Sequence, residues 1–160
     1  MPKKKKKWDL RDLVRRCPYC GSSVHLRSAD GIYKDNSRGV MLYVCARYPD
    51  CDAYVRVQKN TTLPVGTLAN GALRALRLKA HEQFNKLYLS GRMSKHEAYA
   101  WLAALLQVPY SQAHIGHLGE YFCQRVIEES QLYMALPAPR KVPEIGGVVC
   151  ATNRRTAKAG

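Results

Sequence analysis

The sequence lacks the features of a membrane or secreted protein. None of its apolar runs reaches the roughly 18 residues that a membrane helix needs, and no apolar segment follows the N-terminal charges as in a signal peptide. Of the six cysteines, four fall in metal-ligand spacing and two, Cys123 and Cys150, are isolated, which suits a reducing compartment better than a disulfide framework. We therefore expect a soluble cytoplasmic protein, associated with the nucleoid if it binds DNA, and no membrane partner.

The sequence also lacks the local motifs of common enzymes. It has no glycine-rich phosphate loop, no serine or cysteine nucleophile in a recognisable motif, and no His-Glu helix motif of a metallohydrolase. Its 12 acidic residues are outnumbered by 26 Lys and Arg. Those near the cysteines are spaced as turn residues rather than as the paired carboxylates that hold catalytic metals. We therefore expect a protein that is not an enzyme.

Four cysteines occur as two pairs that are typical of a zinc ribbon. Zinc binds four thiolates tetrahedrally at about 2.3 Å, and such a closed shell has no position for a catalytic water. Two alternatives are unrelated reduced thiols and a thioredoxin-like redox pair, but the second pair and the missing βαβ pattern disfavour both. The sequence thus predicts one structural Zn²⁺ ion, held by Cys17, Cys20, Cys45 and Cys51.

A second metal site has weaker support. His114, His117 and Cys123 lie close in the sequence, and His81 or His96 could join them, but their spacing matches no tetrahedral set. Cys123 stands at a helical interval from Ile127, which is more typical of a buried apolar thiol.

The pattern around the cysteines predicts a three-stranded sheet. Alternating or wholly apolar stretches indicate strands over residues 24–27, 40–44 and 53–57, and residues 32–34 can begin the second strand. Residues 35–39 are a loop by composition, with Arg38 at its tip.

The second half of the chain predicts three helices. The first follows an Asn70 cap and ends near Gly91, and the second begins at a capping box and stops before Pro109. The third covers about residues 119–134. Its expected inward face consists of Phe122, Cys123, Val126 and Ile127.

We therefore expect an α+β fold in which an N-terminal three-stranded zinc ribbon is followed by a small three-helix bundle, with disordered basic tails. The predicted divisions are a flexible basic arm over residues 1–16, the ribbon over 17–60, a helical domain over 61–135 and a flexible basic tail over 136–160.

Most of the net charge of +14 falls in the two tails. Residues 1–16 carry eight Lys or Arg against two Asp, residues 136–160 carry five against one Glu, and residues 17–58 carry five against four Asp. Flexible cationic tails can hold nucleic-acid phosphates with an affinity that falls as salt rises. A solubilising tail or a nuclear import signal has the same composition.

Tyrosine and arginine interleave within the predicted ribbon. Five of the ten tyrosines lie in residues 17–58, and such a surface suits single-stranded nucleic acid, where stacking contributes about 1 to 3 kcal/mol per base. The alternative is that about half of these rings form the core around zinc. The candidate nucleic-acid contacts are Lys3, Lys4, Lys5, Lys6, Lys7, Arg15, Arg16, Arg27, Tyr33, Arg38, Tyr43, Arg47 and Tyr48. On the first helix, Arg74, Arg77 and Lys79 are further candidates for phosphate contact, or a solvated face.

Two resemblances follow from the motifs. Cys-Pro-Tyr-Cys-Gly at 17–21 and the Tyr48-Pro49 inside the second cysteine pair resemble the C-terminal zinc ribbons of bacterial type IA topoisomerases, which engage single-stranded DNA. Residues 17–130 resemble a family of small bacterial and phage-borne zinc-finger-containing proteins whose function is not established. The second resemblance is carried by the ribbon cysteines and by motifs at 64–68, 80–84, 93–103 and 114–116.

The sequence favours a non-enzymatic zinc-ribbon protein that binds nucleic acid, with single-stranded DNA preferred over RNA or duplex DNA. In that reading the tyrosines stack on bases and the basic arms contact phosphates. The alternative is a protein-interaction adaptor, in which a purely structural ribbon and the helical domain recruit a partner enzyme to DNA.

Overall fold

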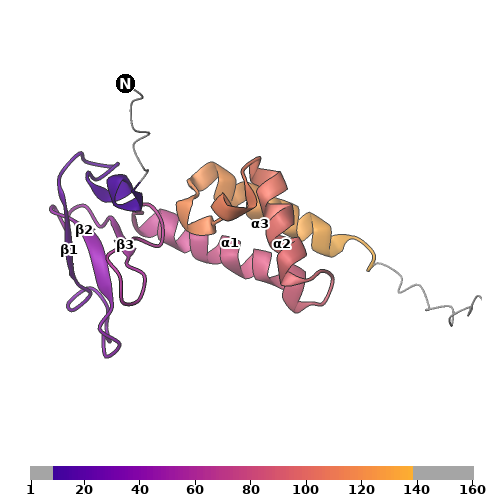
Figure 1. The fold of residues 1–160 in the computed structure, drawn as a ribbon, viewed down its shortest axis with the longest axis horizontal. Helices are drawn as coiled ribbons and strands as arrows, with labels where there is room; N and C mark the ends of the chain where they lie inside the picture. Colours follow the sequence, from indigo (N-terminus) through magenta and orange to yellow (C-terminus); the bar gives the residue numbers. More distant parts are fainter. Residues whose placement is uncertain (1–8, 139–160) are drawn as a thin grey trace, which may run out of the picture.

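A sheet module precedes a helical module in the chain, and the computed structural model describes residues 9–138 (Figure 1). We define the sheet module as residues 9–70 and the helical module as residues 71–138. A three-stranded antiparallel sheet followed by three helices confirms the predicted α+β fold. The lysines at positions 3–7 and the tail residues 139–160 lie outside the described residues.

The sheet separates two small cores. Its strands are antiparallel and lie in the order β1 (Val24–Ser28), β2 (Met41–Cys45) and β3 (Tyr54–Arg56). Because side chains alternate along a strand, Leu42 and Val44 point to one face, where they are buried with Ala29. Cys45 and Val55 point to the opposite face, where the four cysteines gather.

The sequence predicts that residues 32–34 begin the second strand. In the structure they belong instead to the loop that joins β1 to β2. The amides of Ile32 and Tyr33 both donate to the Ala29 carbonyl, at 3.0 and 2.9 Å, and this turn reverses the chain. The Asn36 side chain then accepts from the Val40 amide at 2.7 Å. The closed loop packs Ile32 and Tyr33 onto Leu42 and Val44 instead of extending β2.

Residues 9–16, which the sequence assigns to a flexible arm, are folded onto the sheet module. Residues Leu10–Val14 form a 3-10 helix, η1, and the Asp9 side chain caps it by accepting from the Arg11 amide. Val14 is buried at 3% exposure in the same core as Cys17. The apolar contacts of this short helix attach it to the sheet module.

The three predicted helices are present, with the caps that the sequence indicates. Their bounds are α1 (Gly71–Leu89), α2 (Lys95–Leu106) and α3 (Glu120–Ala135), with 3-10 turns η2 (Tyr110–Gln112) and η3 (Ile115–His117) between the last two. The Asn70 side chain accepts from the Leu73 amide at 2.9 Å, and Ser94 and Glu97 form a complete capping box. None of these helices of the described chain is long and apolar enough to cross a membrane.

The helical module has its own core. Phe84 and Leu87 of α1, Leu102 of α2 and Val126 of α3 are all fully buried there. Phe122 differs from the prediction, since it is 42% exposed instead of facing inward. Its ring packs edge to face on Tyr121, outside the helix interface.

The chain stays on the sheet beyond the predicted boundary at residue 60. Tyr54 and Ala69 exchange two backbone hydrogen bonds, and Val57 bridges to Pro64. Leu68 is buried in the core that holds the cysteines. The helical module therefore begins with α1, which leads directly out of the sheet module (Figure 1).

Candidate metal centre

The four predicted cysteine ligands come together in one cluster. All four sulfur atoms lie within 4.8 Å of one another. Cys17 and Cys51 are 3.5 Å apart between Sγ atoms, and Cys20 and Cys45 are 3.4 Å apart. A zinc tetrahedron with bonds of about 2.3 Å has edges of about 3.8 Å between sulfurs, so the cluster is close to the size that zinc requires.

Two turns and the end of β2 position the sulfurs. In the first turn the Gly21 amide donates to the Cys17 carbonyl at 2.9 Å, and Gly21 takes a φ of +72°, which glycine adopts without strain. In the second turn the Cys51 amide donates to the Arg47 carbonyl at 3.0 Å, and the Tyr48–Pro49 bond is cis. Cys17 and Cys45 are buried, and their partners are half-buried.

The surroundings of the cysteines shift their pKa values in opposite directions. Hydrogen bonds stabilise the thiolate form of one cysteine, whereas burial destabilises the thiolate form of two others. Hydrogen bonds from Ser22 lower the pKa of Cys20 to about 6. Burial raises the pKa of Cys45 to about 12, and it also raises that of Cys51. Four such sulfurs this close need a cation to be deprotonated together, which a bound Zn²⁺ supplies.

The pairing of the sulfurs argues against a redox dithiol. In a thioredoxin-like site the reactive pair is the Cys-x-x-Cys itself, here Cys17 and Cys20. The two short contacts instead join one cysteine of each turn. The cluster offers four soft ligands, enough to fill a tetrahedral shell, so the residues fit a structural metal ion.

A second metal cluster does not appear among residues 9–138, where the four cysteines are the group with metal-binding geometry. The rings of His114 and His117 are 6.1 Å apart between centroids, and Cys123 is fully buried in the helical core. The burial of Cys123 confirms its interpretation as an apolar thiol.

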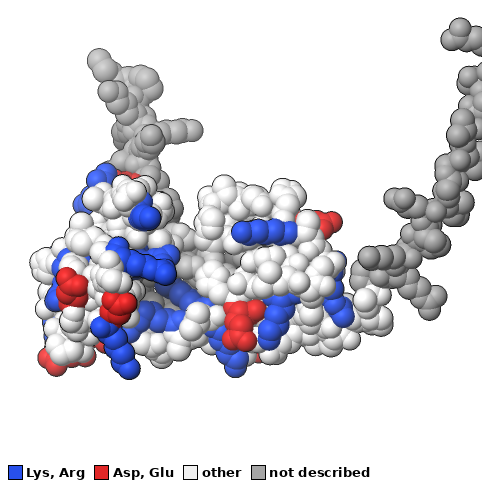
Figure 2. Space-filling view, turned by 90° about the horizontal axis from the view of Figure 1, so that it is seen from below, with Lys and Arg blue, Asp and Glu red and all other residues white. Residues whose placement is uncertain are grey.

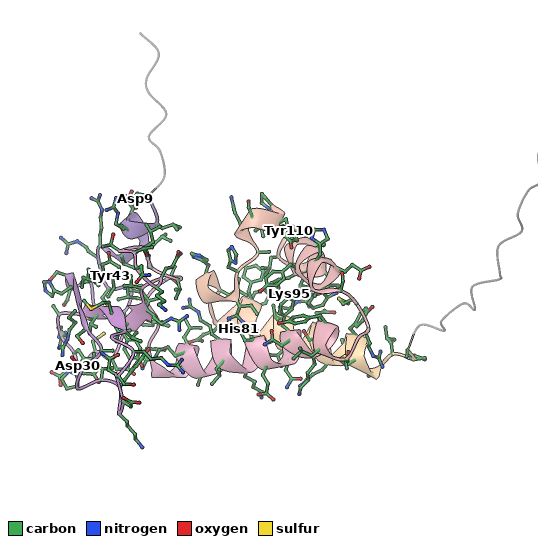
Figure 3. The ribbon with its side chains drawn as sticks, turned by 60° about the horizontal axis from the view of Figure 1, so that its bottom comes forward. Asp9, Asp30, Tyr43, His81, Lys95 and Tyr110 are labelled. Atoms are coloured by element: carbon green, nitrogen blue, oxygen red, sulfur yellow. The ribbon has the colours of Figure 1, made fainter. Side chains whose placement is uncertain are left out.

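The candidate nucleic-acid residues do not form one surface. Arg27, Arg38 and Arg47 are exposed, whereas all three candidate tyrosines are half-buried. Tyr33 and Tyr48 pack on the Leu42 side of the sheet, while Tyr43 lies on the metal side. The Tyr43 hydroxyl donates to the Thr62 carbonyl at 2.7 Å (Figure 3).

The two arginines of the N-terminal arm that are candidate nucleic-acid contacts, Arg15 and Arg16, have partners in the sheet module. Arg15 pairs with Asp12 at 2.6 Å, and Arg16 donates to the Gly21 carbonyl at 3.1 Å. Both remain exposed, so their charges still face solvent.

Arg77 is a buried structural residue and not the phosphate contact that the sequence suggests, and Arg74 has internal partners. Arg77 is 8% exposed, and its guanidinium donates to the Thr67 carbonyl at 2.8 Å and the Leu118 carbonyl at 2.9 Å. Arg74 lies over the Tyr54 ring at 3.7 Å and pairs with Asp52 at 3.0 Å. Lys79, the third candidate on α1, is exposed.

Comparison with known proteins identifies the chain at the family level. A family model described as a zinc-finger-containing domain matches residues 13–133, most of the chain, and the family has no established function. No curated protein and no solved structure gives a significant match. The resemblance of the ribbon to topoisomerase zinc ribbons stays a prediction.

Proposed function

The chain belongs to the family of zinc-finger-containing domains, and from this membership and the cysteine cluster we propose a non-enzymatic protein that binds single-stranded nucleic acid. One Zn²⁺ ion builds the sheet module and takes no part in chemistry. Cationic side chains contact phosphates, and tyrosines stack on bases.

The observation that carries this proposal is that the Lys and Arg side chains of residues 17–58 are exposed and form no ion pairs with the described residues. All five Lys and Arg of residues 17–58 are exposed, and within residues 9–138 none of them forms an ion pair: Arg27, Lys34, Arg38, Arg47 and Arg56. Because no internal ion pair must be broken first, contact between these cations and phosphates costs no ion-pair energy within the protein.

Two of the neighbouring carboxylates are already held by internal partners. Ser28 and Asn36 donate to the Asp30 carboxylate at 2.7 and 2.9 Å, and these bonds lower its pKa. Asp52 pairs with Arg74. Residues 17–58 therefore present five cations without ion pairs in the described part of the chain, beside two carboxylates that have internal partners. Figure 2 shows Lys and Arg spread over this part of the surface.

Half-buried tyrosines are compatible with stacking. Tyr33 and Tyr48 rest on the core of Leu42 and Val44, which holds each ring in place. A ring fixed on one side loses little entropy when a base covers its other side.

A salt titration tests the proposal. We expect the affinity of the zinc-loaded chain for a labelled oligothymidylate to fall steeply as salt rises. The triple variant Arg27→Ala, Arg38→Ala, Arg47→Ala should flatten the plot of log affinity against log salt by about 1 per lost phosphate contact. Arg125→Ala, which removes an ion-paired arginine from α3, is the control. An affinity that does not depend on salt, or equal slopes for the triple variant and the native chain, contradicts the proposal.

A protein-interaction adaptor is the second candidate, and exposed apolar side chains favour it. Leu78 and Leu89 of α1 are 72% and 75% exposed, and Leu132 of α3 is 63% exposed. Such residues are common at protein interfaces. An oligothymidylate affinity too weak to measure even at low salt would favour the adaptor.

A further inference from the structure

A groove separates the sheet module from the helical module. It consists of two adjoining cavities of about 840 and 300 Å³, which share Arg56, Val65, His81 and Gly116 in their walls. Figure 2 shows the hollow between the modules, and Figure 3 shows His81 of α1 beside it. We call these two cavities together the junction groove.

The floor of the junction groove is a fixed contact between distant segments. Gly66 and Gly116 touch through their backbones, and a Cβ on Gly66 would collide with the Gly116 carbonyl. The Thr67 amide donates to that carbonyl at 3.1 Å, and the buried Arg77 joins Thr67 to Leu118. These contacts hold the groove open before any ligand binds, which lowers the entropic cost of binding.

The groove is electropositive. Neither cavity has an Asp or Glu in its wall, whereas Arg56 is exposed at the point where they meet. His81, His114 and His117 line the larger cavity. Burial lowers the pKa of His81 and of His117, so near neutral pH these imidazoles offer hydrogen bonds rather than charge.

The remaining walls are apolar and aromatic. Tyr33 and Tyr54 line the smaller cavity with their rings edge to face at 6.2 Å. Tyr99 and the exposed Phe122 line the larger one. Flat apolar rings next to a cation and hydrogen-bonding imidazoles match the chemistry of a nucleotide, which combines a flat base with an anionic phosphate.

We propose that the junction groove binds an unpaired segment of a single-stranded nucleic acid, with bases against its aromatic walls and a phosphate at Arg56. The volumes suit this ligand, because pockets of about 300 to 1,000 Å³ bury ligands of such size. A base that enters the groove cannot remain paired, which excludes an intact duplex. The inference rests on the proposed function and names the site within it.

Histidine resonances locate the ligand without any substitution. We expect titration of the zinc-loaded chain with a short oligothymidylate to shift the imidazole proton signals of His81, His114 and His117 in the NMR spectrum. His96 on α2 lies outside the groove walls and serves as the internal control, whereas His25 lies two residues from Arg27 on β1 and reports on phosphate contacts of the sheet module.

Two substitutions test the walls. Phe122→Ala should weaken oligothymidylate binding at least about fivefold, by loss of stacking, and its exposed neighbour Tyr121→Ala should not. Arg56→Ala should reduce the salt slope by about 1. Lys59→Ala, another exposed cation of the sheet module, is the matched control.

The outcomes separate the site from the function. Binding that persists while only His25 or His96 shifts, with Phe122→Ala at native affinity, overturns the groove and leaves the proposed function intact. A failure of the native chain to bind any single strand overturns both. Shifts of the three groove histidines with His96 unchanged, together with losses in Phe122→Ala and Arg56→Ala, support the groove whether or not His25 also shifts.

Discussion

At the residue scale, Asp52 couples the metal centre to the helical module. It follows Cys51 directly, and its Oδ2 accepts from the Gly71 amide at 2.8 Å and pairs with Arg74 at 3.0 Å. Arg74 in turn donates to the carbonyls of Asp52 and Ala69, both at 2.6 Å. A residue next to a zinc ligand therefore holds the first turn of α1, where free amides favour an anion.

We predict that Asp52→Ala lowers the free energy of unfolding by about 1 to 2 kcal/mol, because it removes a helix cap and leaves Arg74 without its carboxylate. Urea unfolding of the zinc-loaded chain measures this change. Asp50→Ala is the matched control: it removes an exposed carboxylate from the same turn and should change the stability by less than about 0.5 kcal/mol. Equal losses in the two variants would show that Asp52 does not couple the modules.

Single residues were predictable where the reason is local. The clustering of the four cysteines is predictable because each pair lies on its own turn. The burial of Cys123 is predictable from its helical spacing to Ile127. The sequence predicts an exposed Arg77, because nothing near it in the chain indicates a buried partner. Its partner, the Leu118 carbonyl, lies 41 positions away. The sequence likewise predicts only a turn residue at Asp52, because its partner Arg74 is 22 positions away.

At the element scale, the capping box of α2 gives the fold a pH-dependent contact. The Glu97 carboxylate accepts from the Ser94 amide at 2.6 Å, and this bond lowers the pKa of Glu97 from its ordinary value of 4.5. A carboxyl whose pKa is lower in the folded state stabilises the fold above its unfolded pKa. That contribution disappears as the pH falls through the lowered value.

We predict that Glu97→Ala destabilises the protein at neutral pH and that the difference from the native chain shrinks as the pH falls below 4.5. Trp101 lies on α2, so in a Trp8→Phe background its fluorescence during urea unfolding reports on this helix. Glu82→Ala on α1 is the control, because among residues 9–138 the one ion pair of Glu82 is a 3.7 Å contact with Lys86. A pH-independent difference for Glu97→Ala would rule out the capping contribution.

Helices were easier to predict than the loop between β1 and β2. Asn70 and Ser94 indicate where helices begin, because each side chain accepts a hydrogen bond from an amide three residues later. Residues 32–34 have a strand-like composition because Ile32 and Tyr33 pack on Leu42 and Val44 of β2, so their apolar character reflects burial of a loop against a later strand and not a strand of their own. The folding of η1 escaped prediction because charge dominates residues 1–16, while its two apolar contacts come from Leu13 and Val14.

At the scale of the whole molecule, the core around the cysteines and the helical core imply different degrees of dependence on metal. The core around the cysteines contains few large side chains, among them Val14, Val55 and Leu68. The helical core contains Phe84, Leu102 and Val126 and needs no metal ligand. A core as small as the first rarely folds without a metal or a disulfide.

Chelation of zinc should therefore unfold the sheet module and spare most of the helical module. Metal binding contributes about 10 kcal/mol or more to small zinc modules, which exceeds what this core can replace. We expect a chelator to remove amide-exchange protection from β1, β2 and β3 and to abolish oligothymidylate binding, because the groove loses one wall. The helical circular dichroism signal should fall only slightly, through fraying of α1 where Asp52 no longer caps it.

Metal content gives the matched comparison for this last prediction. The native chain and Cys123→Ala should each hold one zinc ion, since Cys123 is buried in the helical core, whereas Cys45→Ala should lose it. Cys45→Ala without chelator should then resemble the chelated native chain in both exchange and binding. Retention of strand protection after the metal is removed would show that the sheet module folds by its apolar contacts alone, and zinc would need a role other than the structural one argued from its closed sulfur shell.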